Sequence, residues 1–209
     1  MPDAATLLGN APHRPAPGLS LGPGAGLRLA RVHELCGNAR WTLALMIAAR
    51  AGTGPARPLI WIAPTWDSGR LNGDGMSRFL PPAHVVFVTA PRAEDVLWTA
   101  EEVLRSGAAA LMVADLPGLP TLTAVRRMHL AAETGAEATG RRYAPLGLIL
   151  TAGDGGAPGV ESRWRLDARH GAGQTGWRLD RLRARSDPPK RWSVAWRGGG
   201  PELSASVAD

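Results

Sequence analysis

The sequence is short of several residue types, and their scarcity excludes classes of protein. Its 209 residues include one cysteine, one tyrosine, two phenylalanines and a single lysine, Lys190. Cys36 alone cannot form an internal disulfide or a cysteine-based metal site, which argues against a secreted disulfide scaffold and favours a reducing compartment. No apolar run approaches eighteen residues, so no membrane span is expected. Asp3 and Arg14 do not give the start of the chain the layout of a signal peptide, so the sequence predicts a cytoplasmic protein.

The composition predicts one folded domain between two flexible ends. Hydrophobic residues make up 44% of the chain and charged residues 20%, which is ordinary for a globular protein. Residues 1–26 are rich in proline, glycine and alanine, and residues 198–209 are rich in glycine and then in serine and alanine. We therefore expect a flexible N-terminal segment over 1–26, a single domain over 27–197 and a disordered tail over 198–209.

Positive charge is concentrated in one part of the sequence. Between Glu161 and Arg197 there are ten basic residues and four acidic ones, so this segment carries the whole formal charge of +6. Such clustering favours an anionic partner, either DNA or an acidic protein surface. The candidate surface consists of Arg163, Arg165, Arg178, Arg181, Arg183, Arg185, Lys190 and Arg191.

Apolar runs and helical periodicity alternate along the chain. Runs of strand length occur at 32–36, 59–63, 84–89, 110–115 and 146–151, and they read as strands buried on both faces. Helices are expected over 39–51, 93–106 and 121–134, the last with Thr121 as its cap. This alternation predicts an α/β fold with a parallel sheet flanked by helices. The segments "SRWRLDA", "GWRLDRLRA" and "RWSVAW" alternate polar and apolar residues, and we expect them to extend the sheet as antiparallel strands.

The segment "VHELCGNARWTLALMIAAR", residues 32–50, has the strand, turn and helix of a nucleotide-binding protein. A working phosphate loop needs further glycines, a lysine for the terminal phosphates and a hydroxyl for magnesium. Here only Gly37 and Thr42 match that pattern. Arg40 and Trp41 stand where glycine and lysine belong, and we expect them to close the pocket, although Arg40 could still meet an anion at the helix start. The vestigial pocket comprises Gly37, Asn38, Ala39, Arg40, Trp41, Thr42 and Asp115.

Other candidate catalytic groups are isolated. Asp115 ends a hydrophobic strand where a magnesium-orienting carboxylate belongs, but without a phosphate loop a cap or turn role is favoured. The five histidines lack the spacing of metal ligands, and Cys36 lies in an apolar run typical of an inert core thiol. The glycine-rich stretch 153–159 is interpreted as a flexible loop. The sequence therefore predicts no catalytic residue, no metal and no cofactor.

Tryptophan is unusually common, with eight residues, and four of them lie in the basic segment. Trp164, Trp177, Trp192 and Trp196 could stack on bases between arginines that neutralise phosphates. On an amphipathic strand, however, alternation alone puts tryptophan inward and arginine outward. Core packing is therefore the favoured interpretation.

The order of these parts resembles the RecA-like fold, and within it the ImuA family of SOS mutagenesis accessory proteins. The resemblance covers roughly residues 19–197 and is most specific in "LRSGAAALMVADL", a helix end followed by a strand ending in aspartate, which looks like RecA itself. It also rests on "GLRLARVHELCG", "TLALMIAAR", "EDVLWTAEEVLRSGAAALMVADL", "LTAVRRMHLAAE", "GWRLDRLRAR" and "RWSVAW". The chain departs from RecA in its phosphate loop.

The resemblance implies a non-catalytic role in error-prone translesion synthesis during the SOS response to DNA damage. Members of the family act beside ImuB, an inactive relative of the Y-family polymerases, and a DnaE-type polymerase. Its implied protein partners are therefore the ImuB-type relative, RecA and the DnaE-type polymerase, with single-stranded DNA as a further candidate. Two alternatives stay open: a SulA-like inhibitor of cell division, and a divergent RecA-like ATPase that uses Asp115 and Arg40.

Overall fold

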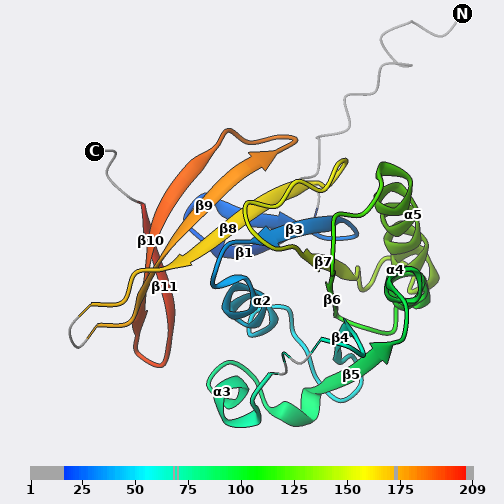
Figure 1. Cartoon of the computed structure of the whole chain (residues 1–209), viewed down its shortest axis with the longest axis horizontal. Coiled ribbons are helices and arrows are strands. Elements are labelled where there is room, and N and C mark those ends of the chain that lie inside the picture. Colours follow the sequence, from blue (N-terminus) through cyan, green and yellow to red (C-terminus); the bar gives the residue numbers. More distant parts are fainter. Residues whose placement is uncertain (1–16, 68, 70, 172–173, 206–209) are drawn as a thin grey trace, which may run out of the picture.

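The computed structural model describes the whole chain except residues 1–16, 68, 70, 172–173 and 206–209. Figure 1 shows the elements in chain order, from the blue N-terminal hairpin to the red C-terminal strands. They are β1 (Gly18–Gly22), β2 (Ala25–Arg28), β3 (Val32–Cys36), α2 (Arg40–Ala48), β4 (Leu59–Pro64), α3 (Gly73–Ser77), η1 (Pro82–His84), β5 (Val85–Ala90), α4 (Ala93–Ser106), β6 (Leu111–Asp115), α5 (Leu122–Ala138), β7 (Leu146–Leu150), β8 (Ser162–Ala168), β9 (Gly176–Ala184), β10 (Lys190–Arg197) and β11 (Gly200–Ala205).

The main sheet has a parallel half and an antiparallel half. Within the described residues it has nine strands in the order β11-β10-β9-β8-β3-β7-β6-β4-β5. Strands β3 to β8 pair in parallel, and β8 to β11 pair antiparallel. Strand β8 belongs to both halves because it lies parallel to β3 on one side and antiparallel to β9 on the other. The fold is therefore a mixed α/β sheet flanked by helices.

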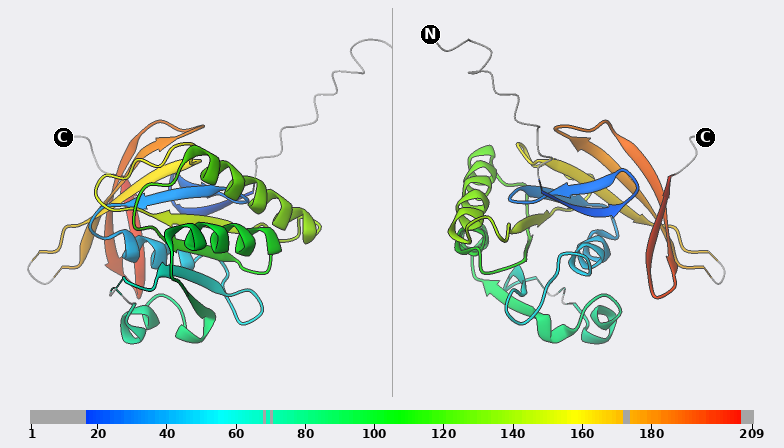
Figure 2. Two further views of the ribbon diagram at one scale, coloured as in Figure 1. Left: turned by 45° about the vertical axis from the view of Figure 1, so that its right-hand side comes forward. Right: turned by 180° about the vertical axis from the view of Figure 1, so that it is seen from behind.

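Helices cover the two faces of the sheet unequally. Helices α4 and α5 bury one face of the parallel half in a core that includes Val32, Met112 and Ile149. Helix α2 and the β1–β2 hairpin bury the opposite face, and that core runs on under the antiparallel strands through Trp164, Trp192 and others. Figure 2 shows α4 and α5 together on one side and the hairpin crossing the sheet on the other. The remaining face of β8, β9 and β10 carries most of the charged side chains of these strands, whereas Arg181 and Lys190 lie on the face of Trp192.

The predicted elements of the central region are confirmed, with two corrections. All five apolar runs form strands and all three helices occur, and Thr121 caps α5 by accepting a bond from the Ala124 N–H. The expectation that β5 is buried on both faces is wrong, because β5 is the edge strand and leaves Val86 and Phe87 exposed. The expectation that residues 162–168 form an antiparallel extension is only half right, because β8 first pairs in parallel with β3.

The prediction of flexible ends is wrong where the structure describes them. Residues 18–28 form the β1–β2 hairpin, whose Leu21, Ala25 and Leu27 are buried in the core. Residues 200–205 form β11, which pairs with β10 in register from Trp192 to Arg197. Glycine and proline there serve the turns of a sheet rather than a linker. Residues 1–16 and 206–209 lie outside the described residues.

Two further expectations concern Cys36 and the membrane. Cys36 is fully buried, and burial, followed by the nearby Glu34 charge, raises the pKa of its thiol to about 12, so the prediction of an inert core thiol is confirmed. Across the described part of the chain, no helix is both long and apolar enough to cross a membrane.

Candidate functional site

The loop between β3 and α2 is closed by the protein itself. The Gly37 N–H donates to the Gly153 carbonyl at 3.0 Å, and the Ala39 N–H donates to the Leu166 carbonyl at 3.0 Å. Between them, the Asn38 N–H donates to Oδ1 of Asp167 at 3.3 Å. In a phosphate loop, N–H groups at these positions converge on a nucleotide. Here their acceptors are two carbonyls and a carboxylate, so the backbone donors that would hold a phosphate are already used.

The carboxylate of Asp167 is the anion that binds at this loop. It is 6% exposed and also accepts from Arg165 Nε at 2.8 Å and from Arg178 Nη2 at 3.2 Å. Burial disfavours its charged form, but the bonds from Asn38 and Arg165 and the charge of Arg178 outweigh burial and lower its pKa. Asp167 is therefore held ionised against the loop.

Position 37 has no room for a side chain and requires glycine. Its φ is +87°, and a Cβ added there would stand 2.5 Å from the Leu166 carbonyl oxygen and 3.0 Å from Oδ1 of Asp167. Strand β8 is thus in direct contact with the turn.

The glycine-rich loop 153–159 is closed in the same way. The N–H groups of Gly156 and Ala157 donate to Oε1 of Glu34 at 2.8 and 3.0 Å, and the Thr151 hydroxyl donates to the same oxygen at 2.7 Å. Glu34 is fully buried and forms an ion pair with Arg163. The prediction of a flexible loop is therefore wrong, because these residues wrap a buried carboxylate of β3.

Arg40, Trp41 and Asp115 do gather beside the closed loop. Asp115 ends β6 at 4% exposure, and its Oδ2 has no hydrogen-bond partner among the described residues. Burial raises its pKa to about 6, the positive charge of Arg40 works in the opposite direction, and Asp67 raises it further. Trp41 packs edge-on against Trp61 with ring centroids 6.1 Å apart. The cluster places a carboxyl group near a guanidinium group but offers no backbone cradle.

The predicted closure of the pocket by Arg40 and Trp41 needs correction. The three loop N–H groups are taken by acceptors from β8 and from the turn after β7. Arg40 instead lies near Asp115 at the end of β6, and Trp41 packs against Trp61 of β4. Thr42 is not part of that group, since it lines a separate hollow of about 470 Å³ together with Phe79 and Trp177. No sequence pattern pointed to Asp167 as a partner of the loop, because it lies 129 residues from Asn38.

Most arginines of the candidate surface are paired with carboxylates. Their partners are distributed as follows: Arg163 pairs with Glu34, Arg165 with Asp154 and Asp167, Arg178 with Asp167 and Asp180, Arg185 with Glu161, and Arg191 with Asp180. Arg183 and Lys190 are exposed and form no ion pair with the described residues. The outward face of β8, β9 and β10 is therefore largely a ladder of alternating charges, in which most of the arginines of the candidate surface have a counterion.

Arg181 is a core residue. It is 5% exposed, donates to the carbonyls of Pro188 and Gly24 at 3.0 and 3.2 Å, and places its guanidinium 5.5 Å from the ring of Trp164 and 5.4 Å from that of Trp192. Both rings are fully buried, so the packing interpretation of these tryptophans is confirmed. Strand alternation could have placed Arg181 inward, because it shares its face with Leu179.

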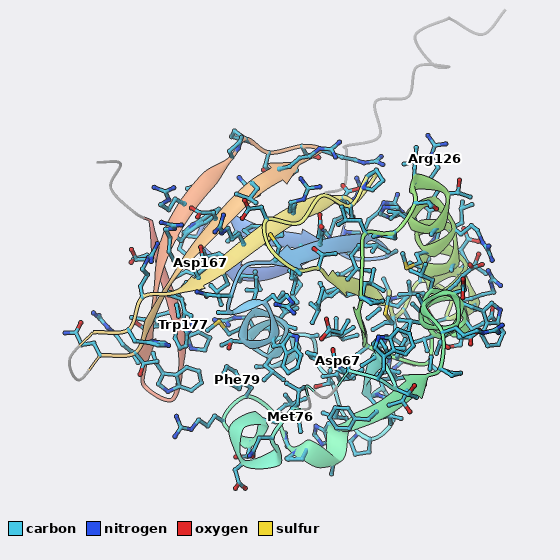
Figure 3. All side chains as sticks on the ribbon, in the orientation of Figure 1. Asp67, Met76, Phe79, Arg126, Asp167 and Trp177 are labelled. Carbon is cyan, nitrogen blue, oxygen red and sulfur yellow. The ribbon has the colours of Figure 1, made fainter. Side chains whose placement is uncertain are left out.

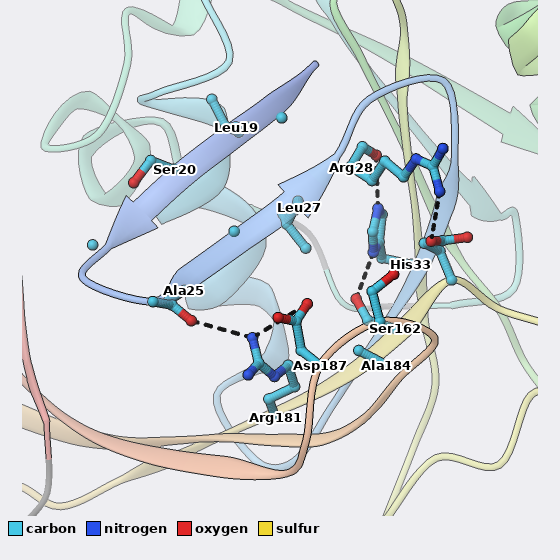
Figure 4. A pocket seen from close by; sticks show the side chains of 16 residues that line it. Leu19, Ser20, Ala25, Leu27, Arg28, His33, Ser162, Arg181, Ala184 and Asp187 are labelled. Carbon is cyan, nitrogen blue, oxygen red and sulfur yellow. Dashed lines mark hydrogen bonds and ion pairs between the residues drawn. The ribbon is translucent and has the colours of Figure 1, made fainter. Parts of the chain in front are cut away.

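A polar hollow of about 550 Å³ lies between the β1–β2 hairpin and the main sheet (Figure 4). At its base the His33 Nε2–H donates to the Arg28 carbonyl at 2.9 Å, so Nδ1 accepts from the Ser162 hydroxyl at 2.6 Å. Ser162 Oγ also accepts from the Trp164 indole at 2.6 Å, and burial lowers the pKa of His33 to about 4. A serine next to a histidine could suggest a nucleophile and its base. Both are over 95% buried and fully bonded, so they join the hairpin to the sheet.

Comparisons with known proteins give limited information. No protein-family model matches the chain, and no curated protein matches it. Among solved structures, it is similar to SulA from Pseudomonas aeruginosa, with 23% identity and a TM-score of 0.44 over 58% of this chain and 98% of the SulA chain. Values this low do not transfer a function.

Proposed function

We propose that the protein is a non-catalytic, RecA-like accessory protein of error-prone translesion synthesis, of the ImuA type. In this role it works through contacts with an ImuB-type polymerase relative, RecA and a DnaE-type polymerase in cells with damaged DNA. The neutral α/β body is the scaffold, and the basic strands β8 to β10 provide a surface for a partner or for DNA.

The self-closed loop is the observation that supports this proposal most. The N–H groups of Gly37, Asn38 and Ala39 bond to protein acceptors, and Asp167 brings a negative charge to the place of a phosphate. A nucleotide would have to displace a carboxylate that is itself held by Arg165 and Arg178. On this proposal the chain keeps the strand, turn and helix of an ATPase without backbone donors free to hold a nucleotide.

The segments that resemble the ImuA family support the cellular role. The most specific of them, "LRSGAAALMVADL", contains strand β6, which ends at Asp115 and lies in the parallel half two strands from β3. A phosphate-loop strand inside a parallel sheet, with helices on both faces, is the arrangement that a RecA-like fold requires.

The proposal that the protein is not an ATPase is tested by nucleotide titration. Calorimetry with magnesium and ATP, and a hydrolysis assay with and without single-stranded DNA, should show neither binding nor turnover. The Asp115→Asn variant should behave in the same way. Magnesium-dependent ATP binding that Asp115→Asn abolishes would favour the divergent ATPase instead.

The cellular half is tested by deleting the gene and measuring damage-induced mutation. We expect the mutation frequency after DNA damage to fall and to be restored by the wild-type gene and by Asp115→Asn. If the deletion leaves mutation unchanged, while overproduction makes cells filamentous, the SulA-like alternative is favoured. Affinity purification from damage-treated cells should recover the polymerase-type partners.

A further inference from the structure

Four arginines converge on one open hollow at the far end of the antiparallel half. The hollow has a volume of about 630 Å³, and its lining includes Arg169, Arg178, Arg191 and Arg197. Arg169 directly follows the end of β8, where its N–H donates to the Gly176 carbonyl at 2.8 Å. Residues two apart on a strand share a face, so Arg197 lies on the same outward side of β10 as Arg191. We call this hollow the arginine groove.

The four guanidinium groups are of two kinds. Arg178 and Arg191 are held in place by the buried Asp180, through Nε bonds of 3.0 and 2.6 Å. These bonds leave both terminal nitrogens of Arg191 and the Nη1 of Arg178 without a partner among the described residues. Arg169 and Arg197 are exposed and form no ion pair with any described residue. The groove therefore combines two oriented donors with two exposed positive charges that have no ion pair among the described residues.

The rest of the lining suits an extended anion. Among the described residues, no aspartate or glutamate lines the groove, and the neutral polar side chains that do are Gln174, Thr175 and Ser193. Gly176 and Ala195 lie opposite each other in the β9–β10 ladder, so no large side chain stands at that point. Arginine together with serine, threonine and glutamine is the set that proteins use to bind the phosphates of DNA.

The position of the exposed apolar side chains distinguishes two kinds of anionic partner. Protein partners dock mainly through aromatic and aliphatic anchors. The large apolar side chains that the described chain exposes, such as Trp66, Phe87 and Trp98, are absent from the lining of the groove. Val194 and Trp177, which do line it, are 2% and 8% exposed, and Trp177 packs against His170. Trp196, which also lines it and is partly buried, packs edge-on against Phe79 with ring centroids 5.1 Å apart. The groove thus has charge, hydrogen-bond donors and one partly buried indole rather than a set of exposed apolar anchors, which favours a phosphate backbone over a protein surface.

We propose that the arginine groove binds the phosphodiester backbone of a nucleic-acid strand. This deepens the proposed function by making DNA a direct partner, with a site centred on Arg169 and Arg197 as well as on Arg178 and Arg191. Arg163 and Arg181 take no part, since they hold Glu34 and the tryptophan core. Binding does not depend on base sequence, because the groove offers contacts to phosphate rather than to base edges.

The test is fluorescence anisotropy with a labelled oligo(dT) strand and purified full-length protein. We expect a dissociation constant of about 1–100 µM at physiological salt, with affinity falling steeply as salt rises. The double variant Arg169→Ala/Arg197→Ala should bind at least about tenfold more weakly and lower the salt slope by about 1 to 1.5, since each phosphate contact on a single strand contributes about 0.7. Ser193→Glu, which adds a carboxylate to an exposed position, should weaken binding in the same direction.

The matched control is Arg126→Ala/Arg142→Ala, which removes the same charge elsewhere. Arg126 is exposed on α5, at the opposite end of the molecule from Asp167 and Trp177 (Figure 3). This control should bind like the wild type. Equal binding by the groove variant and the control would overturn the proposal, as would wild-type protein that binds polyglutamate but not oligo(dT). Because no polymerase is present, failure here leaves the proposed partner contacts untouched.

Discussion

The closed loop at β3 and the arginine groove on β9 and β10 differ in how far their hydrogen-bond donors are satisfied within the protein. Both present hydrogen-bond donors that suit an anion, and Asp167 contacts both, accepting from Asn38 on one side and from Arg178 on the other. In the loop every donor from Gly37 to Ala39 has an acceptor within the protein. In the groove the guanidinium groups have more N–H groups than the aspartates use.

This contrast shows that an anion site depends on the hydrogen-bond donors that have no acceptor within the protein, and not on the total number of donors. A backbone N–H has one proton to give, and one carboxylate oxygen satisfies it. An arginine has five, so an internal ion pair can orient it without using it up. The loop can thus be closed while the charged sheet next to it stays open to a ligand.

The largest expected effect comes from Arg163→Ala, which asks whether this arginine belongs to the fold or to the surface. Removing it leaves the fully buried Glu34 without its ion-pair partner, and we expect the free energy of unfolding to fall by about 3–5 kcal/mol. Urea denaturation measures this. Arg183→Ala, at the position paired with Arg163 in the β8–β9 ladder, should change stability by less than about 0.5 kcal/mol. Similar losses for both would contradict the assignment.

Asp167→Ala should affect both the closed loop and the arginine groove, because Asp167 accepts hydrogen bonds from Asn38 and from Arg178. It removes the acceptor of the Asn38 N–H and one partner each of Arg165 and Arg178, at a cost of about 2 kcal/mol. It should also tighten oligo(dT) binding, because a negative charge beside the groove is lost. Asp187→Ala, whose carboxylate is 56% exposed and 3.8 Å from Arg181, should cost less than about 0.5 kcal/mol. If both variants destabilise equally, Asp167 has no special role at the loop.

The pH dependence of stability sharpens the contrast between Asp115 and Asp167. The folded protein raises the pKa of Asp115 to about 6, so it binds this proton more tightly than the unfolded chain does. Stability is therefore lost as the pH rises from about 4 to about 6, on the order of 2 kcal/mol. Asp115→Asn should remove this loss and be relatively more stable at pH 7 than at pH 4, as thermal unfolding at both values would measure.

Asp167 has the opposite sign. Its pKa is lowered, so its contribution is present at neutral pH and is lost as the pH falls below about 4. The Asp167→Ala variant should therefore approach the wild type in stability under acid conditions. An Asp115→Asn difference that does not change between pH 4 and pH 7 would show that this carboxylate is not held in its neutral form.

The smallest expected effect is on the stability of the groove variant. Arg169 and Arg197 are exposed and without ion pairs among the described residues, so Arg169→Ala/Arg197→Ala should change the free energy of unfolding by less than about 0.5 kcal/mol. Thermal unfolding of the variant beside the wild type measures this. A larger loss would mean that weaker DNA binding reports damage to the fold.

Periodicity along the chain was enough to predict the parallel half and its helices. Apolar runs and capping residues such as Thr121 are local signals, and the structure confirms them. The closure of the loop could not be predicted from the sequence, because it depends on β8 lying parallel to β3. The alternating pattern of β8 instead resembled that of an antiparallel edge strand. Pairing along a sheet is a long-range property that alternation does not specify.

The basic surface was predicted as a cluster but not as an arrangement. The sequence contains the aspartates that neutralise Arg165, Arg178 and Arg191, but their pairing depends on the register between strands. A shift of register between Arg163 and Trp164 also turns Arg183 outward while Arg181 stays inside. Arg169 and Arg197 were not selected as site residues, because nothing in the linear order marks them as free of carboxylates.

The tryptophan pairs give each half of the molecule its own optical reporter. In the antiparallel half, Trp164 and Trp192 stand 5.6 Å apart with planes tilted by 32°, and in the parallel half Trp41 and Trp61 stand 6.1 Å apart at 81°. Indole transitions at such separations couple, and the circular dichroism they produce depends on the angle between the rings. The two halves can therefore be followed separately during unfolding, without any added label.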